Sequence, residues 1–168
     1  MRHPSIVSTA LAFALLWPAS PAAAASPRDT LVVSAAWLAQ HLKDPDLVLL
    51  HVGDRGEYAT AHIPGARFAD LREISVSDPG GTGSGLTLEM PSPDVLREKL
   101  EALGISDGSR IVVYFGKDWL SPSTRLVFTL DYAGLGERVS LLDGGQPAWV
   151  RHGGALTAEI PPIRRGAL

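Results

Sequence analysis

The sequence predicts an α/β fold with a mostly parallel sheet and helices on both of its faces. Short continuous apolar runs, such as residues 47–52 and 111–114, have the length and β-branched content of strands buried on both sides. These runs alternate with segments whose apolar residues recur at helical spacing, and turn residues separate the two kinds of segment. Such alternation implies βαβ units with right-handed crossovers.

In the first half of the chain, the pattern predicts five elements. They are a strand at 31–33, a helix at 34–42, a strand at 47–52, one or two helical turns at 56–61 and a strand at 66–69. Ser34 is a suitable N-cap for the first helix. Pro64 disfavours helical backbone at Ile63, and Gly65 permits a positive φ, so His62–Ala66 is predicted to be a sharp turn. His62 has no acid or nucleophile paired with it in the sequence, and we interpret its ring as tying this turn to nearby backbone rather than as catalytic.

The second half is predicted to continue the alternation around a central strand. The segments are a glycine-rich surface loop at 77–88, a helix at 94–103, the central strand at 111–114, a helix at 125–130, a strand at 139–142 and a helix at 146–152. Ser121 followed by Pro122 is a typical N-cap with proline at the first helical position. The loop between the central strand and this helix would lie at the carboxyl end of the sheet, where sites form in open α/β folds.

The 168 residues carry a net charge of −3 and contain no cysteine. This charge does not suggest a nucleic-acid surface, and the missing thiols exclude disulfides and thiolate chemistry within these residues. The other histidines show no i, i+4 pairing with one another, so we expect no metal site and no cofactor.

Residues 1–25 have the pattern of a secretory signal peptide. Arg2 gives a basic start, residues 6–17 form an apolar run too short to span a bilayer, and Ala23-Ala24-Ala25 is a small-residue cleavage pattern. We expect cleavage near Ala25, a periplasmic or secreted product, and no membrane partner afterwards; an uncleaved N-terminal anchor is the alternative. The expected organisation is a signal peptide at 1–25, one α/β domain at 30–158 and a linker-like tail at 159–168 that shows no packing pattern of its own.

Two stretches, together with the central strand, resemble the rhodanese-like sulfurtransferases. The first stretch, Glu57-Tyr58 with His62-Ile63-Pro64-Gly65-Ala66, resembles the family's N-terminal signature. The second, residues 142–149 with Gly153-Gly154, resembles its C-terminal signature. The signature positions are Glu57, Tyr58, His62, Pro64, Gly65, Asp143, Gly144, Gly145 and Trp149. The resemblance covers about Leu31 to Thr157 and implies a doubly wound domain around a five-stranded parallel sheet. Residues 66–70 and 90–105 further resemble the N-terminal, non-catalytic half of two-domain thiosulfate or mercaptopyruvate sulfurtransferases, whose catalytic cysteine belongs to the other half.

The departures from the family concern the residues of the reaction. Phe115 stands where the resemblance places the active cysteine, and His51-Val52-Gly53 replaces a common aspartate–valine–arginine run, although Asp54-Arg55 follow one step later. The loop equivalent to the active site consists of Phe115, Gly116, Lys117, Asp118, Trp119, Leu120 and Ser121.

Sulfur transfer through a persulfide needs a thiolate, so we expect no activity from this chain alone. Two interpretations remain open. The chain is either the non-catalytic part of an exported sulfurtransferase, with a catalytic C-terminal domain as partner in cis or trans, or an exported stand-alone binding or interaction module. The loop either binds a small anion through Gly116, Lys117 and Ser121 at a helix N-terminus, or is a degenerate loop filled by Phe115, Trp119 and Leu120, with Lys117 solvated. A further alternative is that Trp119 and Leu120 form a docking patch for a missing C-terminal half or another partner.

Overall fold

The computed structural model describes residues 31–77, 87–117 and 120–168, and in these residues five strands form one parallel sheet. The strands are β1 (Val32–Val33), β2 (Leu47–Val52), β3 (Arg67–Phe68), β4 (Arg110–Phe115) and β5 (Val139–Leu142). Their order across the sheet is β1-β5-β4-β2-β3, so β4 is central and pairs with β2 on one side and β5 on the other. The predicted five-stranded parallel α/β fold is therefore confirmed.

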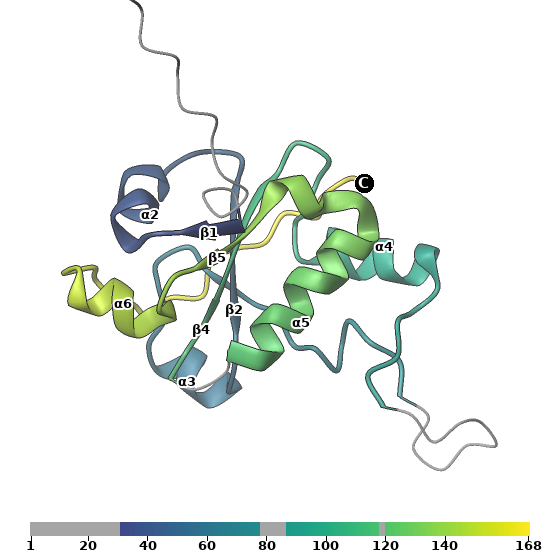
Figure 1. Cartoon of the computed structure of the whole chain (residues 1–168), viewed down its shortest axis with the longest axis horizontal. Helices are drawn as coiled ribbons and strands as arrows, with labels where there is room; N and C mark the ends of the chain where they lie inside the picture. Colours follow the sequence, from purple (N-terminus) through teal and green to yellow (C-terminus); the bar gives the residue numbers. More distant parts are fainter. Residues whose placement is uncertain (1–30, 78–86, 118–119) are drawn as a thin grey trace, which may run out of the picture.

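Helices cover both faces of the sheet (Figure 1). They are α2 (Ala35–His41), α3 (Arg55–Thr60), α4 (Pro93–Ala102), α5 (Leu120–Leu130) and α6 (Gly145–Arg151), with turns η1 (Asp131–Leu135) and η2 (Gly136–Arg138) after α5. Helices α4 and α5 pack on one face, whereas α2, α3 and α6 pack on the other.

The continuous apolar runs supply both layers of the core, because successive side chains of a strand point to opposite faces. In β4, Ile111 and Val113 pack in the layer of α4 and α5, whereas Val112 and Tyr114 pack in the layer of α2, α3 and α6. All four side chains are fully buried. This placement explains why the run has no polar alternation.

Two boundaries around the central loop differ from those predicted. β4 continues one residue beyond Tyr114 to Phe115, and α5 begins at Leu120 rather than after a Ser121 cap. Pro122 is accommodated because the first turn of a helix leaves its amide groups without intrahelical partners, so a proline there loses no hydrogen bond.

The tail at 159–168 contains no helix or strand, yet it lies against the body of the domain. The amide of Gly166 donates to the Glu101 carbonyl oxygen over 2.8 Å, and Leu168 packs against the core layer of α4 and α5. The expected signal peptide and most of the glycine-rich loop fall at 1–30 and 78–86, outside the described residues. Elsewhere in the chain, no described helix has the length and apolar content needed to cross a membrane.

Candidate functional site

The loop equivalent to the active site follows the carboxyl end of the central strand, as the sequence predicts. Phe115 is the last residue of β4, Gly116 and Lys117 follow, and Leu120 and Ser121 open α5. Asp118 and Trp119 lie outside the described residues. The loop therefore occupies the position that open parallel sheets use for ligand sites.

Phe115 packs against the N-terminus of α6. A Cβ added to Gly145 would lie 2.7 Å from the Phe115 carbonyl oxygen and 2.8 Å from its ring. Gly145 also has a φ of +57°, which glycine adopts at little cost. The position where the family resemblance places a cysteine is thus held by an aromatic side chain in close contact with a neighbouring helix.

Glu57 of α3 faces the loop from the other side. Its Oε1 lies 3.7 Å from Lys117 Nζ, and its Oε2 is buried without a hydrogen-bond partner among the described residues. A Cβ on Gly116 would lie 2.7 Å from this Oε2. The sequence identifies Glu57 only as a signature position, because its pairing with Lys117 arises from the way α3 packs beside β4.

A pocket of about 350 Å³ opens beside this pair, between α3 and the start of α6. Lys117, Glu57 and Gln146 line it, and the Gln146 Oε1 atom is a second buried oxygen without a partner among the described residues. The Gln146 amide nitrogen donates to the Ala61 carbonyl oxygen over 3.2 Å. An anion in this pocket would meet one lysine, one carboxylate and one amide oxygen, so the described part of the loop is a poor anion cradle.

His51 lies beneath the same loop, at the position of the family's common acidic residue. It is fully buried, and neither ring nitrogen has a hydrogen-bond partner among the described residues. Its ring lies between those of Tyr58 and Tyr114, at centroid distances of 5.4 Å and 4.9 Å. Burial, with a smaller contribution from nearby His62, lowers the pKa of His51 from 6.5 to about 4. The residue is therefore neutral near pH 7 and brings no charge to the loop.

Asp54 and Arg55, the only nearby substitutes for the family's acid and base, are engaged elsewhere. The Asp54 Oδ1 atom accepts a hydrogen bond of 2.9 Å from the Glu57 amide and caps α3. Arg55 Nη2 lies 2.8 Å from a Glu73 carboxylate oxygen and 3.6 Å from an Asp70 oxygen.

The N-terminal signature residues serve to hold the turn after α3. The Tyr58 hydroxyl donates to the Ala66 carbonyl oxygen over 2.8 Å, and the Tyr58 ring stacks on His62 at 4.0 Å. His62 Nδ1 lies 2.7 Å from the Tyr58 carbonyl oxygen, and His62 Nε2 lies 3.1 Å from that of Glu159. The buried ring of His62 thus bonds to backbone, as interpreted from the sequence. Pro64 and Gly65 form the turn itself, with Gly65 at a φ of +79°.

The C-terminal signature holds α6 and the chain beyond it. Asp143 donates its amide to the Val33 carbonyl oxygen over 2.9 Å, and Gly144 follows at a φ of +67°. Trp149 is buried, and its Nε1 donates to the Ala155 carbonyl oxygen over 2.8 Å. Gly154 lies directly against the indole, where no Cβ fits. The two signatures therefore stabilise the turn after α3 and the position of α6, which lie around the loop.

Neither a nucleophile nor a metal centre appears in the described part of this region. No group of three or more His, Asp or Glu side chains in residues 31–77, 87–117 and 120–168 could hold a metal ion. The sheet and the loop at its carboxyl edge define an open α/β domain in which the signature residues surround a loop without the thiol that sulfur transfer requires.

Comparisons with known proteins identify the family. A model of the rhodanese-like domain matches residues 34–152, and the chain belongs to this sulfurtransferase family. It is 35% identical over 143 residues to the probable 3-mercaptopyruvate sulfurtransferase of Pseudomonas aeruginosa, covering 80% of this chain and 50% of that protein. It is 32% identical over 134 residues to the thiosulfate sulfurtransferase of Azotobacter vinelandii, covering 78% and 46% of the two chains.

The solved structure of SseA from Escherichia coli, a 3-mercaptopyruvate sulfotransferase, superposes with a TM-score of 0.67 at 28% identity. The match covers 82% of this chain and 55% of SseA. The chain thus spans about half the length of the curated relatives that it matches.

Proposed function

We propose that this chain is the non-catalytic, N-terminal half of an exported thiosulfate or 3-mercaptopyruvate sulfurtransferase. On this proposal, a catalytic half that carries the cysteine is its partner, either in the same polypeptide or as a separate chain. The observation that carries the proposal is Phe115, which packs against Gly145 at the end of the central strand, in a sequence without any cysteine. The half-length coverage of the sulfurtransferase relatives supports it.

The chemical reason for expecting no activity from this chain alone is the persulfide intermediate of sulfur transfer. Sulfane sulfur is carried as a persulfide on an activated thiolate, and a hydroxyl or thioether side chain does not form that intermediate. Within the described loop, Lys117 is paired with Glu57, so the positive charge that would support an anionic transition state is partly neutralised.

The direct test is a sulfur-transfer assay on the purified chain with thiosulfate or mercaptopyruvate as donor and cyanide as acceptor. We expect no turnover above the uncatalysed rate. Sustained turnover by protein free of contaminating sulfurtransferase would refute the proposal.

A sharper test restores the thiol with Phe115→Cys. The amides at the start of α5 and Lys117 should lower the pKa of this thiol, so we expect rapid alkylation by iodoacetamide but little or no turnover, because the donors are not preorganised. Phe115→Ser, which removes the ring without adding sulfur, is the matched control and should not alkylate. Adding Glu57→Gln to Phe115→Cys removes the opposing carboxylate and should lower the thiol pKa further. Robust turnover by Phe115→Cys alone would instead show a working cradle that has lost only its cysteine.

The second candidate is a stand-alone exported interaction module. Exposed large apolar side chains on α5 and η1 favour it: Leu120 and Phe128 of α5 and Tyr132 of η1 are 51%, 55% and 57% exposed. Reading the DNA that follows the codon for Leu168 separates the two candidates. A second rhodanese-like half with a cysteine after its central strand supports the first, and an unrelated reading frame supports the second.

A further inference from the structure

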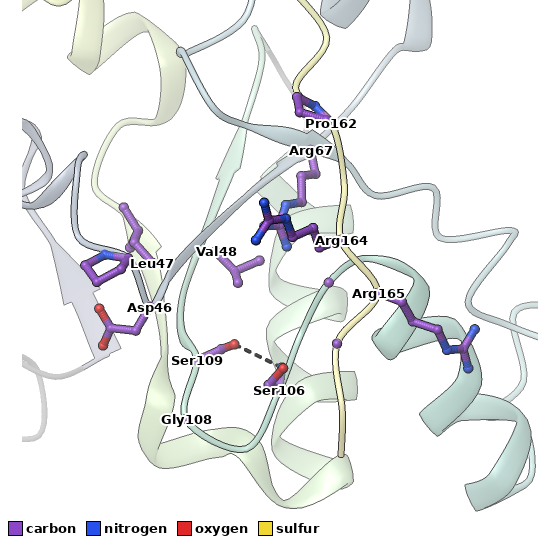
Figure 2. Close-up of a pocket in the computed structure, with 13 residues that line it drawn as sticks. Asp46, Leu47, Val48, Arg67, Ser106, Gly108, Ser109, Pro162, Arg164 and Arg165 are labelled. Atoms are coloured by element: carbon purple, nitrogen blue, oxygen red, sulfur yellow. Dashed lines mark hydrogen bonds between the residues drawn. The ribbon is translucent and has the colours of Figure 1, made fainter.

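A pocket of about 440 Å³ lies at the amino-terminal edge of the sheet, away from the loop that follows β4. Its walls come from the turns that precede β2 and β4, from β3, and from the C-terminal tail (Figure 2). β2 and β4 begin at Leu47 and Arg110, so this pocket is at the opposite end of these strands from Phe115. None of the family signature positions lines it.

Arg67 of β3 projects into this pocket with its guanidinium fixed. Its Nη1 donates to the Leu103 carbonyl oxygen at the end of α4. The residue after Leu103 is Gly104, with a φ of +78°, and a Cβ there would collide with the Arg67 guanidinium. The half-buried position of Arg67 lowers the pKa of its side chain through desolvation.

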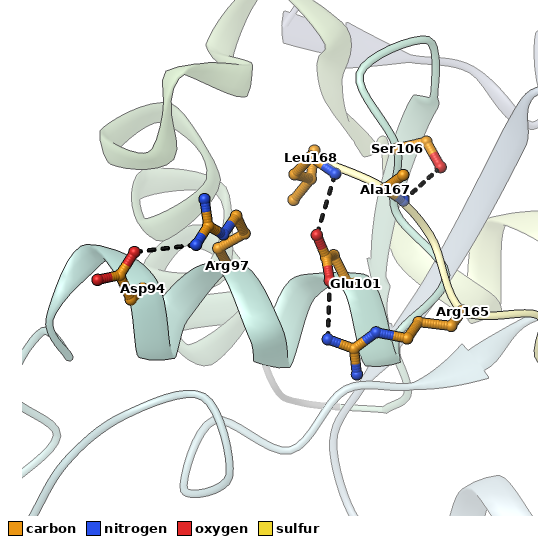
Figure 3. A network of polar contacts seen from close by, with 7 residues as sticks. All are labelled: Asp94, Arg97, Glu101, Ser106, Arg165, Ala167 and Leu168. Atoms are coloured by element: carbon orange, nitrogen blue, oxygen red, sulfur yellow. Dashed lines mark hydrogen bonds and ion pairs between the residues drawn. The ribbon is translucent and has the colours of Figure 1, made fainter.

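Arg164 reaches the same pocket because the tail is held against α4 and the turn that follows it (Figure 3). Glu101 makes two of these contacts: its side chain accepts a hydrogen bond of 2.7 Å from Arg165 and one of 3.2 Å from the Leu168 amide. The amide of Ala167 donates to Ser106 Oγ over 3.1 Å. Figure 2 shows the side chains of Arg67 and Arg164 directed into the same part of the pocket, near Val48, whereas Arg165 points away.

Among the described residues, neither Arg67 nor Arg164 forms an ion pair, whereas the adjacent Arg165 is paired with Glu101. Asp46 is the one acidic residue among those that line the pocket, and it lies beyond ion-pair distance from both arginines. Two guanidinium groups thus share a partly enclosed site in a chain whose net charge is −3. Their mutual repulsion would be relieved by an anion between them.

We propose that Arg67 and Arg164 bind a small tetrahedral dianion, of the class of sulfate, thiosulfate and phosphate. Guanidinium groups present paired N–H donors that match two oxygens of such an anion. Ser106 and Ser109 line the same pocket, and each hydroxyl oxygen accepts a backbone amide, so each hydroxyl hydrogen remains available to an anion. This site does not depend on the function proposed above.

The site also couples the anion to the tail. Arg67 belongs to the sheet and Arg164 to the tail, so the complete site exists only while the tail is docked. An anion that binds the complete site must therefore stabilise docking by the same free energy with which docking strengthens binding.

Isothermal titration calorimetry with sodium sulfate, thiosulfate and phosphate, at constant ionic strength in a chloride background, tests the proposal. We expect one saturable site with a dissociation constant near or below about 1 mM for at least one of the three anions. Acetate is the monovalent control and should bind more weakly. Absence of saturable binding, or acetate bound as tightly as the dianions, would overturn the proposal.

Four variants locate the site. Arg164→Gln should weaken binding about tenfold or more, since a hydrogen bond between charged groups is lost. Arg67→Gln should do the same, and Arg164→Gln decides the matter if Arg67→Gln folds poorly, because Arg164 is exposed. Arg151→Gln removes the same charge from an exposed arginine of α6 that does not line the pocket and should leave the affinity within about twofold, whereas Asp46→Asn should strengthen binding. Equal weakening by Arg164→Gln and Arg151→Gln would show general charge attraction and sink the proposed site.

The coupling has a readout of its own. Sulfate should slow hydrogen exchange of the Gly166 amide, which bonds to the Glu101 carbonyl oxygen, in the wild type but not in Arg164→Gln. Slowing of the same size in Arg164→Gln would contradict the coupling.

Discussion

His51 is an imidazole in a setting that offers it no hydrogen bond. It lies in the middle strand pair, enclosed by Tyr58, Tyr114 and Phe68, with both nitrogens unpaired among the described residues. Burying a neutral imidazole without hydrogen bonds costs some folding free energy, and burying a charged imidazole there costs much more. Because the lowered pKa belongs to the folded state only, His51 links the stability of the domain to pH.

We predict that His51 makes the domain acid-labile. Its pKa is about 4 when folded and 6.5 as a free side chain. The unfolded chain therefore binds the proton first as pH falls, and the free energy of unfolding should drop between pH 6.5 and 4, by about 3 kcal/mol at most. His51→Leu removes this proton site and should flatten that part of the pH profile without lowering stability at pH 7. Urea unfolding at pH 7 and pH 4.5 measures both effects.

His152 supplies the control for this experiment. Its side chain is exposed, so His152→Gln should leave the acid response of the wild type in place. An equally steep loss of stability in His51→Leu would show that other groups cause the acid lability.

At the level of secondary-structure elements, α6 closely approaches the end of β4 beside the candidate site. Gly145 begins α6 with a φ of +57° and faces the Phe115 backbone and ring. Gly153, just beyond the same helix, has a φ of +87° but nothing within 4 Å of a Cβ placed on it. The two glycines share a backbone conformation and differ in the space around them.

We predict that Gly145→Ala destabilises the domain by about 2–4 kcal/mol, since it adds overpacking against Phe115 to the strain of a positive φ. Gly153→Ala should cost only the strain, about 1–2 kcal/mol. Thermal and urea unfolding of both variants measure the difference. Adding Phe115→Ala should relieve much of the Gly145→Ala penalty, and equal penalties for the two glycine variants would contradict the close packing of α6 on β4.

At the scale of the whole molecule, the sheet order places β4 in the centre with a helical layer on each face, so its two ends carry separate sites. The loop equivalent to the active site lies at the carboxyl end, and the pocket of Arg67 and Arg164 lies at the amino end. The tail contacts the turn after α3 as well as this pocket: the Glu159 carbonyl oxygen lies 3.1 Å from His62 Nε2, and Arg164 lines the pocket.

We propose export of the whole molecule and predict that the mature protein begins at Ser26. The apolar run at 6–17 and Ala23-Ala24-Ala25 carry this prediction. Mass spectrometry of the periplasmic fraction measures the N-terminus. Ala25→Tyr should block cleavage because the last residue before the cut must be small, whereas Ala22→Tyr, outside the small-x-small pattern, should not. Retention of Met1 in exported wild-type protein would contradict the prediction.

The sequence by itself determined the fold class, the strand positions and the missing chemistry. The strands at 47–52 and 139–142 are found where the apolar runs predict them, because burial on both faces leaves a continuous apolar pattern that can be read locally. The absence of cysteine also needs no structure. The two signatures are local in the same way, since turns around Gly65 and Gly144 need residues of particular backbone freedom.

Only the tertiary structure decided which side chains meet. Glu57 and Lys117 are 60 positions apart in the sequence, and Arg67 and Arg164 are 97 apart, so their approach depends on how the elements pack. The lack of a hydrogen-bond partner for His51 among the described residues likewise depends on the side chains that the fold places around it. The tail gave no packing pattern because its contacts are mostly backbone hydrogen bonds to α4 and the following turn. Hydrogen bonds of this kind leave no periodic trace in the sequence, so they become visible only when the fold brings the segments together.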